Sequence, residues 1–341
     1  MSEKIQNGWK WVKLGEVVKI KHGYAFPGKN ITNQDTGKVL VTPGNFNIGG
    51  GFKSDKLKFY SGDYPKEYEL QGGEIIVVMT DLSKDADILG YSAKIPTDKK
   101  YKYLHNQRIG LVEIISSHID KDFIYWLMRT TDYHFFIVGG ASGTSVMHTS
   151  PDRINEYSFP LPPLPEQKAI AEVLSSLDDK IDLLHRQNKT LEEMAMTLFR
   201  QWFIEPTKDG LPEGWEEGKL GEIVKISSGK GLNNKDFVEN GLYPVLGSNG
   251  EIGRTNNFLF NDKLIFTGRV GTLGNVFISE GKVWLSDNTL IVKPISQEYF
   301  YFVYFFLKMA KLEELNVGST QPLIRQTDLK ELDIIIPDKE T

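Results

Sequence analysis

Residue types that carry out catalysis in other proteins are present in this chain, but their spacing matches no catalytic motif. The phosphate-binding pattern Gly-x-x-x-x-Gly-Lys-Ser/Thr is absent, because all five Gly-Lys pairs are followed by Asn, Val, Leu or Gly. No Gly-x-Gly-x-x-Gly opens a helix, and no His-Glu-x-x-His occurs. The six histidines are scattered and there are no cysteines, so no metal site is predicted. The sequence therefore indicates a protein that is not an enzyme and that binds no cofactor itself.

Clusters of hydrogen-bonding side chains are the remaining candidates for a binding site. Residues 105–108 form a dense group of donors before a predicted strand, and residues 286–289 take the corresponding place later in the chain. Two Gly/Ser/Thr loops, at residues 142–145 and 318–321, repeat a pattern in which small residues let a backbone approach phosphate closely. Each stretch can equally be an ordinary turn, and both interpretations stay open.

The composition is that of a globular protein with about two domains. The chain has 341 residues, of which 40% are hydrophobic and 11% aromatic, and a net charge of −5. That charge does not by itself indicate a nucleic-acid binder, although a local basic face or a basic partner is compatible with it. The N-terminus lacks the apolar core of a signal peptide, and the longest apolar runs are too short to span a bilayer. We therefore expect a cytoplasmic protein without membrane contact.

One long helix is predicted to position the other elements. Residues 161–204 begin with a proline-rich stretch and continue without Pro or Gly from Glu166 to Phe203. Such a helix is about 57 Å long at about 1.5 Å per residue. Apolar residues follow one another along it with the 3.5-residue period of a coiled coil, with one asparagine among them. This helix–helix seam, which requires a partner helix, consists of Ile170, Leu174, Leu177, Ile181, Leu184, Asn188, Leu191, Ala195, Leu198 and Trp202.

A repeated module flanks the helix. Residues 8–20 and 214–226 share the pattern Trp-x-x-x-x-Leu-Gly-Glu. The ends of the modules also agree, because Gly-Thr-Ser at Gly143 and Gly-Ser-Thr at Gly318 precede similar proline-containing segments. The middles differ in length. The sequence therefore predicts a first domain over residues 1–160, the helix over 161–206 and a second domain over 207–341.

Short strand-like runs broken by Gly, Asn and Asp fill both modules. Each module also has one aromatic-rich helix candidate, at residues 122–129 and 298–309. Its aromatic stripe is interpreted as a core face, with a base-stacking platform as the alternative. The predicted fold class is α/β, more specifically α+β. It comprises two similar domains, each a mixed or antiparallel β-rich module with short helices, joined by a long coiled-coil-type helix.

The module boundaries and the helix start resemble the specificity (S) subunit of Type I restriction–modification systems. The sharpest signal is the sequence PLPPLPEQKAI at residues 160–170, and the Trp-x-x-x-x-Leu-Gly-Glu pattern at Trp9 and Trp215 is the second. The resemblance covers essentially the whole chain. It implies two target recognition domains, each reading one half of a split DNA sequence, held apart by two antiparallel helices. The second of those helices is expected to be missing, because the sequence stops where it would begin.

The resemblance also implies partners. An S subunit carries no chemistry: two modification subunits, which bind S-adenosylmethionine, methylate adenines, and a restriction subunit adds ATP-driven translocation and cleavage. The only Pro-Pro, at Pro162 and Pro163, is not in the Asn/Asp-Pro-Pro-Tyr/Phe motif of an adenine methyltransferase. The partner of the seam is expected to be a modification subunit or a second copy of the chain. A helix of about 57 Å corresponds to at most about 17 base pairs at about 3.4 Å each.

Candidate DNA contacts are chosen by residue type. Bases are read by Arg, Asn, Gln, Ser and Thr on loops, and phosphates are bound by basic side chains and backbone amides. Arg269, in the loop at residues 267–271, joins the stretches described above, with a surface turn as its alternative. The candidates are His105, Asn106, Gln107, Arg108, Ser142, Gly143, Thr144, Ser145, His148, Arg269, Asp287, Asn288, Thr289, Ser319, Thr320, Gln321 and Arg325.

A second class of function stays open, namely a homodimeric coiled-coil scaffold with two protein-binding modules. Salt dependence separates the two classes. DNA binding through several phosphates weakens steeply as salt rises, whereas a mostly apolar protein contact does not.

Overall fold

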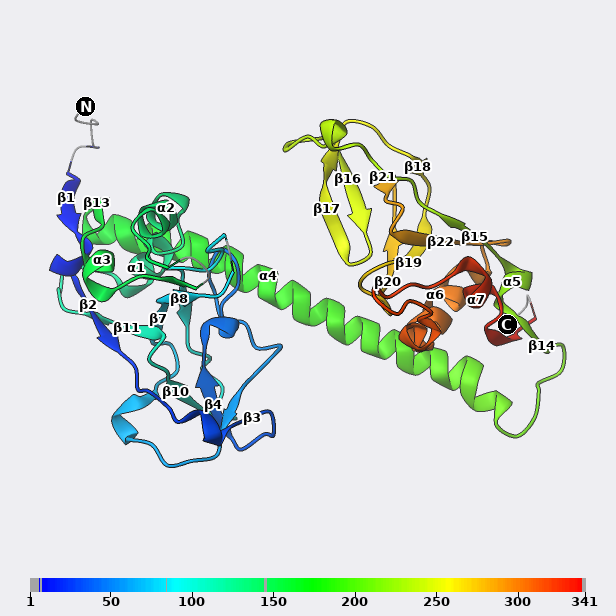
Figure 1. Cartoon of the computed structure of the whole chain (residues 1–341), viewed down its shortest axis with the longest axis horizontal. Helices are drawn as coiled ribbons and strands as arrows, with labels where there is room; N and C mark the ends of the chain where they lie inside the picture. The colour runs from blue at the N-terminus through cyan, green and yellow to red at the C-terminus, as the bar shows by residue number, and fades with distance from the viewer. Residues whose placement is uncertain (1–5, 7, 84, 144–145, 339–341) are drawn as a thin grey trace. The chain divides into compact units, whose positions relative to one another are not determined.

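The computed structural model describes residues 6, 8–83, 85–143 and 146–338 of the chain (Figure 1). The chain forms two compact units, Met1–Leu184 and His185–Thr341, and the division falls inside one long helix, α4 (Leu164–Phe199). Each unit contains one β-rich module with short helices, so the predicted α+β class is confirmed. The predicted domain boundaries at residues 160 and 206 stay predictions.

A four-stranded antiparallel sheet with the order β2-β11-β7-β9 is the centre of the first unit. A second sheet has the order β3-β5-β4-β10-β6, and in it β10 runs parallel to β4. Two short ladders, β1–β13 and β8–β12, complete the module. The strands are β1 (Lys10–Lys13), β2 (Val18–His22), β3 (Ile31–Thr32), β4 (Lys38–Val41), β5 (Phe59–Tyr60), β6 (Glu69–Leu70), β7 (Ile75–Val78), β8 (Thr80–Asp81), β9 (Ser92–Lys94), β10 (Lys102–His105), β11 (Ile109–Ile114), β12 (Met147–His148) and β13 (Ser158–Leu161), and the helices are α1 (Lys121–Leu127), α2 (Thr131–Gly139) and α3 (Pro151–Asn155).

The second unit repeats this topology. Its central sheet has the order β15-β22-β19-β20, and a further sheet, β17-β16-β21-β18, again contains one parallel pair, β16 and β21. The ladder β14–β23 corresponds to β1–β13. The elements are β14 (Glu216–Lys219), α5 (Leu220–Ile223), β15 (Val224–Ser228), β16 (Tyr243–Gly247), β17 (Gly250–Thr255), β18 (Phe260–Asn261), β19 (Leu264–Gly268), β20 (Val276–Ser279), β21 (Lys282–Leu285), β22 (Thr289–Pro294), α6 (Tyr299–Met309), α7 (Gln326–Lys330) and β23 (Asp333–Ile336).

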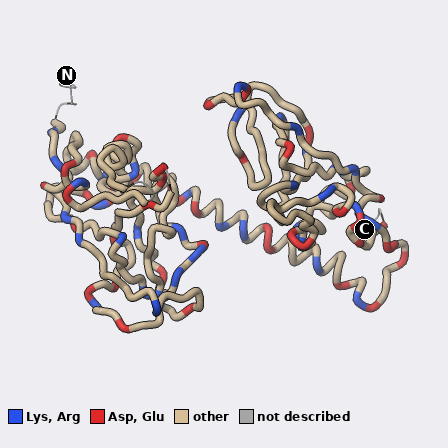
Figure 2. The backbone as a smooth tube through the Cα atoms, in the orientation of Figure 1, with Lys and Arg blue, Asp and Glu red and all other residues tan. Residues whose placement is uncertain are grey.

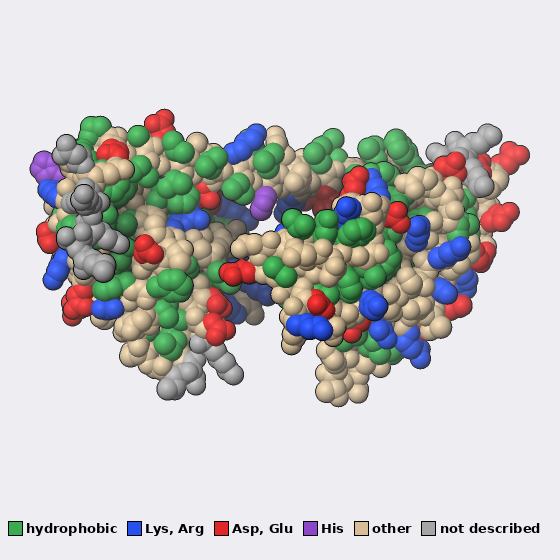
Figure 3. Space-filling view, turned by 90° about the horizontal axis from the view of Figure 1, so that it is seen from above, with side chains coloured by type: hydrophobic (Ala, Val, Ile, Leu, Met, Phe, Trp, Pro, Cys, Tyr) green, Lys and Arg blue, Asp and Glu red, His purple; other side chains and the backbone are tan. Residues whose placement is uncertain are grey.

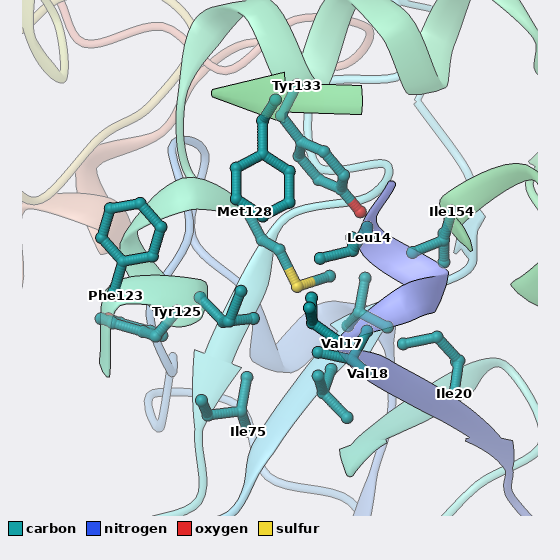
Figure 4. Close-up of a cluster of buried hydrophobic side chains, with 14 of the residues drawn as sticks. Leu14, Val17, Val18, Ile20, Ile75, Phe123, Tyr125, Met128, Tyr133 and Ile154 are labelled. Carbon is teal, nitrogen blue, oxygen red and sulfur yellow. The ribbon is translucent and has the colours of Figure 1, made fainter. Parts of the chain in front are cut away.

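The central sheet of the first module is buried on both faces, which explains why β7 is apolar throughout. Ile75 and Val77 face the helices, in a cluster with Leu14, Val18, Phe123, Met128, Tyr133 and Ile154 (Figure 4). Ile76 and Val78 face the second sheet. Successive side chains of a strand point to opposite faces, so a strand between two layers has no polar side.

Helix α4 follows the predicted helix closely but not at its ends. It begins at Leu164, and its regular part ends at Phe199. A π-helical turn continues over Arg200–Ile204, and Pro206 lies in the 3-10 turn that follows. A proline cannot continue the regular backbone hydrogen bonding of a helix, which accounts for the irregular end.

Candidate nucleic-acid interface

Three chain segments of the first module meet at one end of its central sheet. They are the turn between β10 and β11, the chain just after β7, and the hairpin that ends in β12. The Met79 N–H donates to the Arg108 carbonyl at 2.9 Å, and the Thr149 N–H donates to the Met79 carbonyl at 3.0 Å. Candidates from residues 105–108 and 142–148, far apart in the sequence, are therefore brought together.

The second module joins its corresponding segments in the same way. The Arg269 N–H donates to the Asn288 carbonyl at 2.7 Å, and the Ile324 N–H donates to the Arg269 carbonyl at 2.9 Å. The Gly271 N–H donates to the Pro322 carbonyl at 3.0 Å. We name this meeting point the loop junction: residues 79–81, 106–108, 142–143 and 146–149 in the first module, and 269–271, 286–288 and 317–324 in the second.

One glycine in each module packs directly against the backbone of the loop junction. A Cβ on Gly23 would collide with the backbone carbonyl of Asn106, and a Cβ on Gly229 would collide with that of Ser286. Asn106 and Ser286 are therefore equivalent positions. The sequence alignment that paired residues 105–108 with 286–289 was wrong by one residue, because the equivalent stretch is 285–288.

Two of the candidate DNA contacts, His105 and Thr289, are buried and present no side chain at the surface. The ring of His105 is 1% exposed, and its Nε2 lies 2.8 Å from the Ile109 carbonyl. Burial lowers the pKa of His105 to about 4, so the ring is neutral near pH 7. Thr289 is completely buried, and its Oγ1 donates to the Ser286 carbonyl at 2.7 Å. Both residues stabilise the turn from inside the fold, because strand residues on either side of it point into the core.

The other turn residues of the first module lie at the surface. The Arg108 N–H donates to Asn106 Oδ1 at 3.0 Å, which fixes the turn, while the side chains of Gln107 and Arg108 are exposed. His148 is also exposed, and its Nδ1 lies 3.1 Å from Thr80 Oγ1. The loop junction of the first module thus presents an amide, a guanidinium and an imidazole.

The glycine of each Gly/Ser/Thr loop lies close to a backbone carbonyl. A Cβ on Gly143 would collide with the Val146 carbonyl, and a Cβ on Gly318 would collide with the Gln321 carbonyl. A folding role therefore accounts for both glycines, and the phosphate contact predicted for these loops stays a prediction. Ser142, Ser319, Thr320 and Gln321 are exposed, while Thr144 and Ser145 lie outside the described residues.

Four candidates of the second module differ in how exposed they are and in the contacts they make. Asp287 and Asn288 are exposed on the turn. Arg269 is half-buried, and its Nη1 donates to the Asp287 carbonyl at 3.5 Å, a long hydrogen bond. Arg325 instead makes two hydrogen bonds of 2.8 Å to the carboxylate of Asp328, and this pairing lowers the pKa of Asp328. Arg325 is therefore engaged with a residue of α7, the helix that follows it.

Charge does not single out the loop junction. Lys and Arg residues are interspersed with Asp and Glu residues along the backbone of both modules (Figure 2). Recognition at this place would therefore depend on particular side chains together with the backbone.

Most of the predicted seam of α4 is exposed within each unit. The exposed fraction is 58% for Leu177, 53% for Ile181, 61% for Leu191 and 60% for Trp202. Hydrophobic side chains are visible at the surface in the space-filling view (Figure 3). Ile170 and Ala195 are half-buried, and Leu174, Leu184, Asn188 and Leu198 are exposed. The seam therefore has room for the partner helix that the period predicts.

Other faces of α4 attach it to the modules, through residues that the sequence did not reveal. Trp126 Nε1 donates to Ser175 Oγ at 2.9 Å, and Arg129 Nη1 lies 3.2 Å from the Asp178 carboxylate. Buried Gln167 accepts from the Asp120 N–H at 2.9 Å. In the second unit, Glu192 forms an ion pair with Lys308 of α6 and accepts a hydrogen bond from the Tyr304 hydroxyl. Such pairs join residues that are far apart in the sequence, so no local sequence pattern predicts them.

A hollow lies beside the last seam residues. Its volume is about 300 Å³, and it is lined by Leu198 and Trp202 of the helix together with Tyr301, Phe305 and Pro337. The apolar surface of the seam therefore extends onto the second module.

A long helix flanked by two copies of one α+β module defines an internally duplicated protein. The family model of the Type I restriction modification DNA specificity domain matches residues 6–193 and again residues 212–341. The chain therefore belongs to this family.

Relatives and a solved structure agree with that assignment. The chain is 26% identical over 258 residues to the Type I restriction enzyme MjaIX specificity subunit of Methanocaldococcus jannaschii. The matched region covers 64% of this chain and 59% of that protein. The chain is 27% identical over 244 residues to the EcoBI specificity subunit of Escherichia coli, covering 71% and 47%. The chain thus spans about half the length of these relatives. The crystal structure of a Type-I restriction-modification system S subunit from M. genitalium shares the fold, with a TM-score of 0.60 at 18% identity over 99% of this chain and 88% of that one.

Two further observations concern the described residues alone. None of the helices in that part of the chain is long and apolar enough to cross a membrane. Within the same residues, no group of three or more His, Asp or Glu side chains is placed to hold a metal ion.

Proposed function

We propose that this chain recognises a split sequence in double-stranded DNA, with each module reading one half-site at its loop junction. The observation that supports the proposal most directly is the equivalent meeting of candidate residues in both modules of a DNA specificity family. Gln107, Arg108 and Asn288 are exposed there and are of the types that read base edges. The small residues of the Gly/Ser/Thr loops would let the backbone approach the DNA phosphates.

In this proposal the chain is a non-catalytic, cytoplasmic subunit. The relatives are named specificity subunits of Type I restriction enzymes. We infer that adenine methylation belongs to modification subunits, which bind S-adenosylmethionine, and that cleavage belongs to a restriction subunit. The chain itself binds no cofactor. The exposed seam of α4 is assigned to helices of the modification subunits.

The test is to express the chain with its modification subunits in a host that lacks the system, and to map adenine methylation across the genome. The expected result is one split motif with an unread spacer. Arg108→Ala should change base preference in the first half-site only, and Asn288→Ala in the second half-site only. Absence of any new methylation, despite an assembled complex, would contradict the proposal.

A homodimeric scaffold is the second candidate, and the exposed seam residues favour it because identical seams can pair with each other. Salt titration separates the two functions. Specific DNA binding that neutralises several phosphates should weaken by orders of magnitude between about 50 and 200 mM salt. Binding of a protein ligand through apolar contacts should change little over the same range.

A further inference from the structure

The loop junction of the second module has a fourth segment, the turn between β16 and β17. Gly268 lies against this turn, since a Cβ there would come within 3.0 Å of Ser248 Cβ. The next residue, Asn249, meets Asn275 from the chain that leads into β20. Asn275 Nδ2 donates to Asn249 Oδ1 at 2.8 Å, and both side chains are exposed. A hydrogen-bonded pair of amides thus lies beside the loop junction.

The fold holds both asparagines in place. Asn249 sits in a tight turn, because Gly247 and Gly250 are paired across β16 and β17 and Gly250 has a φ of 111°. The Asn275 carbonyl accepts a hydrogen bond from Thr267 Oγ1 at 2.7 Å, and Thr267 is completely buried. The backbone on either side of the amide pair is therefore fixed by the fold.

The pairing leaves a defined set of groups free to bind. A carboxamide carries one acceptor oxygen and an NH2 group with two donors. The bond uses one lone pair of the Asn249 oxygen and one N–H of Asn275, so the whole Asn249 NH2 and the whole Asn275 oxygen remain, beside the second N–H of Asn275. If both amides are reversed, one NH2 and one oxygen again remain, so the outward pattern does not depend on which way they are oriented.

This pattern matches one base edge. In the major groove adenine presents N7 as an acceptor and its N6 amino group as a donor, and carboxamides are the side chains suited to that edge. We propose that the Asn249–Asn275 pair reads an adenine in the second half-site, donating to N7 and accepting from N6. The proposal rests on the proposed function and adds to it the base and the residues that read it.

The first module carries different chemistry in its loop junction. Its chain after β7 turns around buried Asp81, whose carboxylate accepts hydrogen bonds from the Ser83 N–H at 2.8 Å and the Ile88 N–H at 2.7 Å. Asp81 is thus used within the fold. Because the amide pair belongs to the second module, its loss should affect the second half-site alone.

Two variants test the inference by methylome mapping in the assembled methyltransferase. Asn249→Ala removes one member of the pair and should lower the preference for adenine at one position by roughly tenfold or more. Asn275→Asp leaves two outward oxygens, since the Asn249 amide turns to donate to the carboxylate. Its preference should move from adenine toward cytosine, whose N4 is a donor. Asn261→Asp is the matched control, because Asn261 is exposed in β18 and pairs with the far end of β21.

The outcomes separate the inference from the proposed function. A change at one base position of the second half-site, with the first half-site intact, supports the inference. An unchanged motif, or methylation that falls by the same factor at all sequences, overturns it and leaves the proposed function standing. A wild-type complex that methylates nothing overturns both.

Discussion

His105 shows how a residue with binding chemistry can serve the fold instead. It ends β10, just before the turn that carries Gln107 and Arg108, and its ring lies inside the module. The loop junction therefore has two layers: side chains that point inward and hold the turn, and side chains that point outward and are free. Sequence type alone cannot assign a residue to one layer or the other.

The buried ring of His105 predicts a pH-dependent stability. Its pKa is lowered to about 4, against an ordinary value near 6.5, so the unfolded chain binds a proton that the folded chain does not. The stabilisation is complete above about pH 6.5 and is lost as the pH falls toward about 4, by up to about 3 kcal/mol. Urea unfolding at pH 7, 5.5 and 4.5 measures it.

Two variants isolate this titration. His105→Phe should reduce the slope of stability against pH over that window, whatever its effect at pH 7. His118→Ala removes an exposed histidine of the same module and should leave the slope unchanged. Equal slopes for wild type and His105→Phe would show that other groups cause the pH dependence.

At the scale of elements, the attachment of α4 to the first module centres on Arg129. Its Nε donates to the Gly49 carbonyl at 2.9 Å, its Nη1 lies 3.2 Å from Asp178, and its guanidinium lies 4.4 Å from the centre of the Trp126 ring. A planar guanidinium serves all three contacts at once, and a lysine ammonium cannot.

Arg129→Lys is therefore expected to loosen the helix. The first unit should lose about 1–2 kcal/mol of stability, since the stacking contact and the bond to Gly49 both disappear. Hydrogen exchange of α4 over residues 173–180 should become faster. Asp178→Asn should have a smaller effect, because Asp178 is 45% exposed and its ion pair is partly screened. Lys180→Ala is the control on the same helix, and an equal effect there would exclude a specific role for Arg129.

The sequence predicted elements better than sites. The helix was readable because its seam has a strict period, and the repeat because Trp9 and Trp215 begin the same pattern. The contacts Arg129–Asp178 and Asn249–Asn275 could not be predicted, since each joins residues that only the folded chain brings together. The alignment error at residues 285–288 arose because turn residues carry no periodic signal.

At the scale of the whole molecule, the exposed seam predicts association. Replacing Leu177, Ile181 and Leu184 with Lys should abolish binding to modification subunits or to a second copy, because three charges would be buried at the contact. Light scattering measures the mass with and without modification subunits. The unfolding midpoint of each unit should change little, since these side chains are exposed. The control replaces Asp179, Lys180 and Gln187 with Ala, and unchanged mass in the Lys variant would refute the seam.

The loop junctions are joined by main-chain N–H and carbonyl groups. Every residue supplies the carbonyl, and every residue except proline supplies the N–H. Outward side chains such as Gln107, Arg108 and Asn288 can therefore be exchanged by mutation without dismantling the scaffold beneath them. Under the proposed function, a lineage could acquire a new target sequence through a few substitutions, or through inheritance of one different module. Methylation and cleavage would then change together, because both would depend on the DNA sequence that this chain recognises.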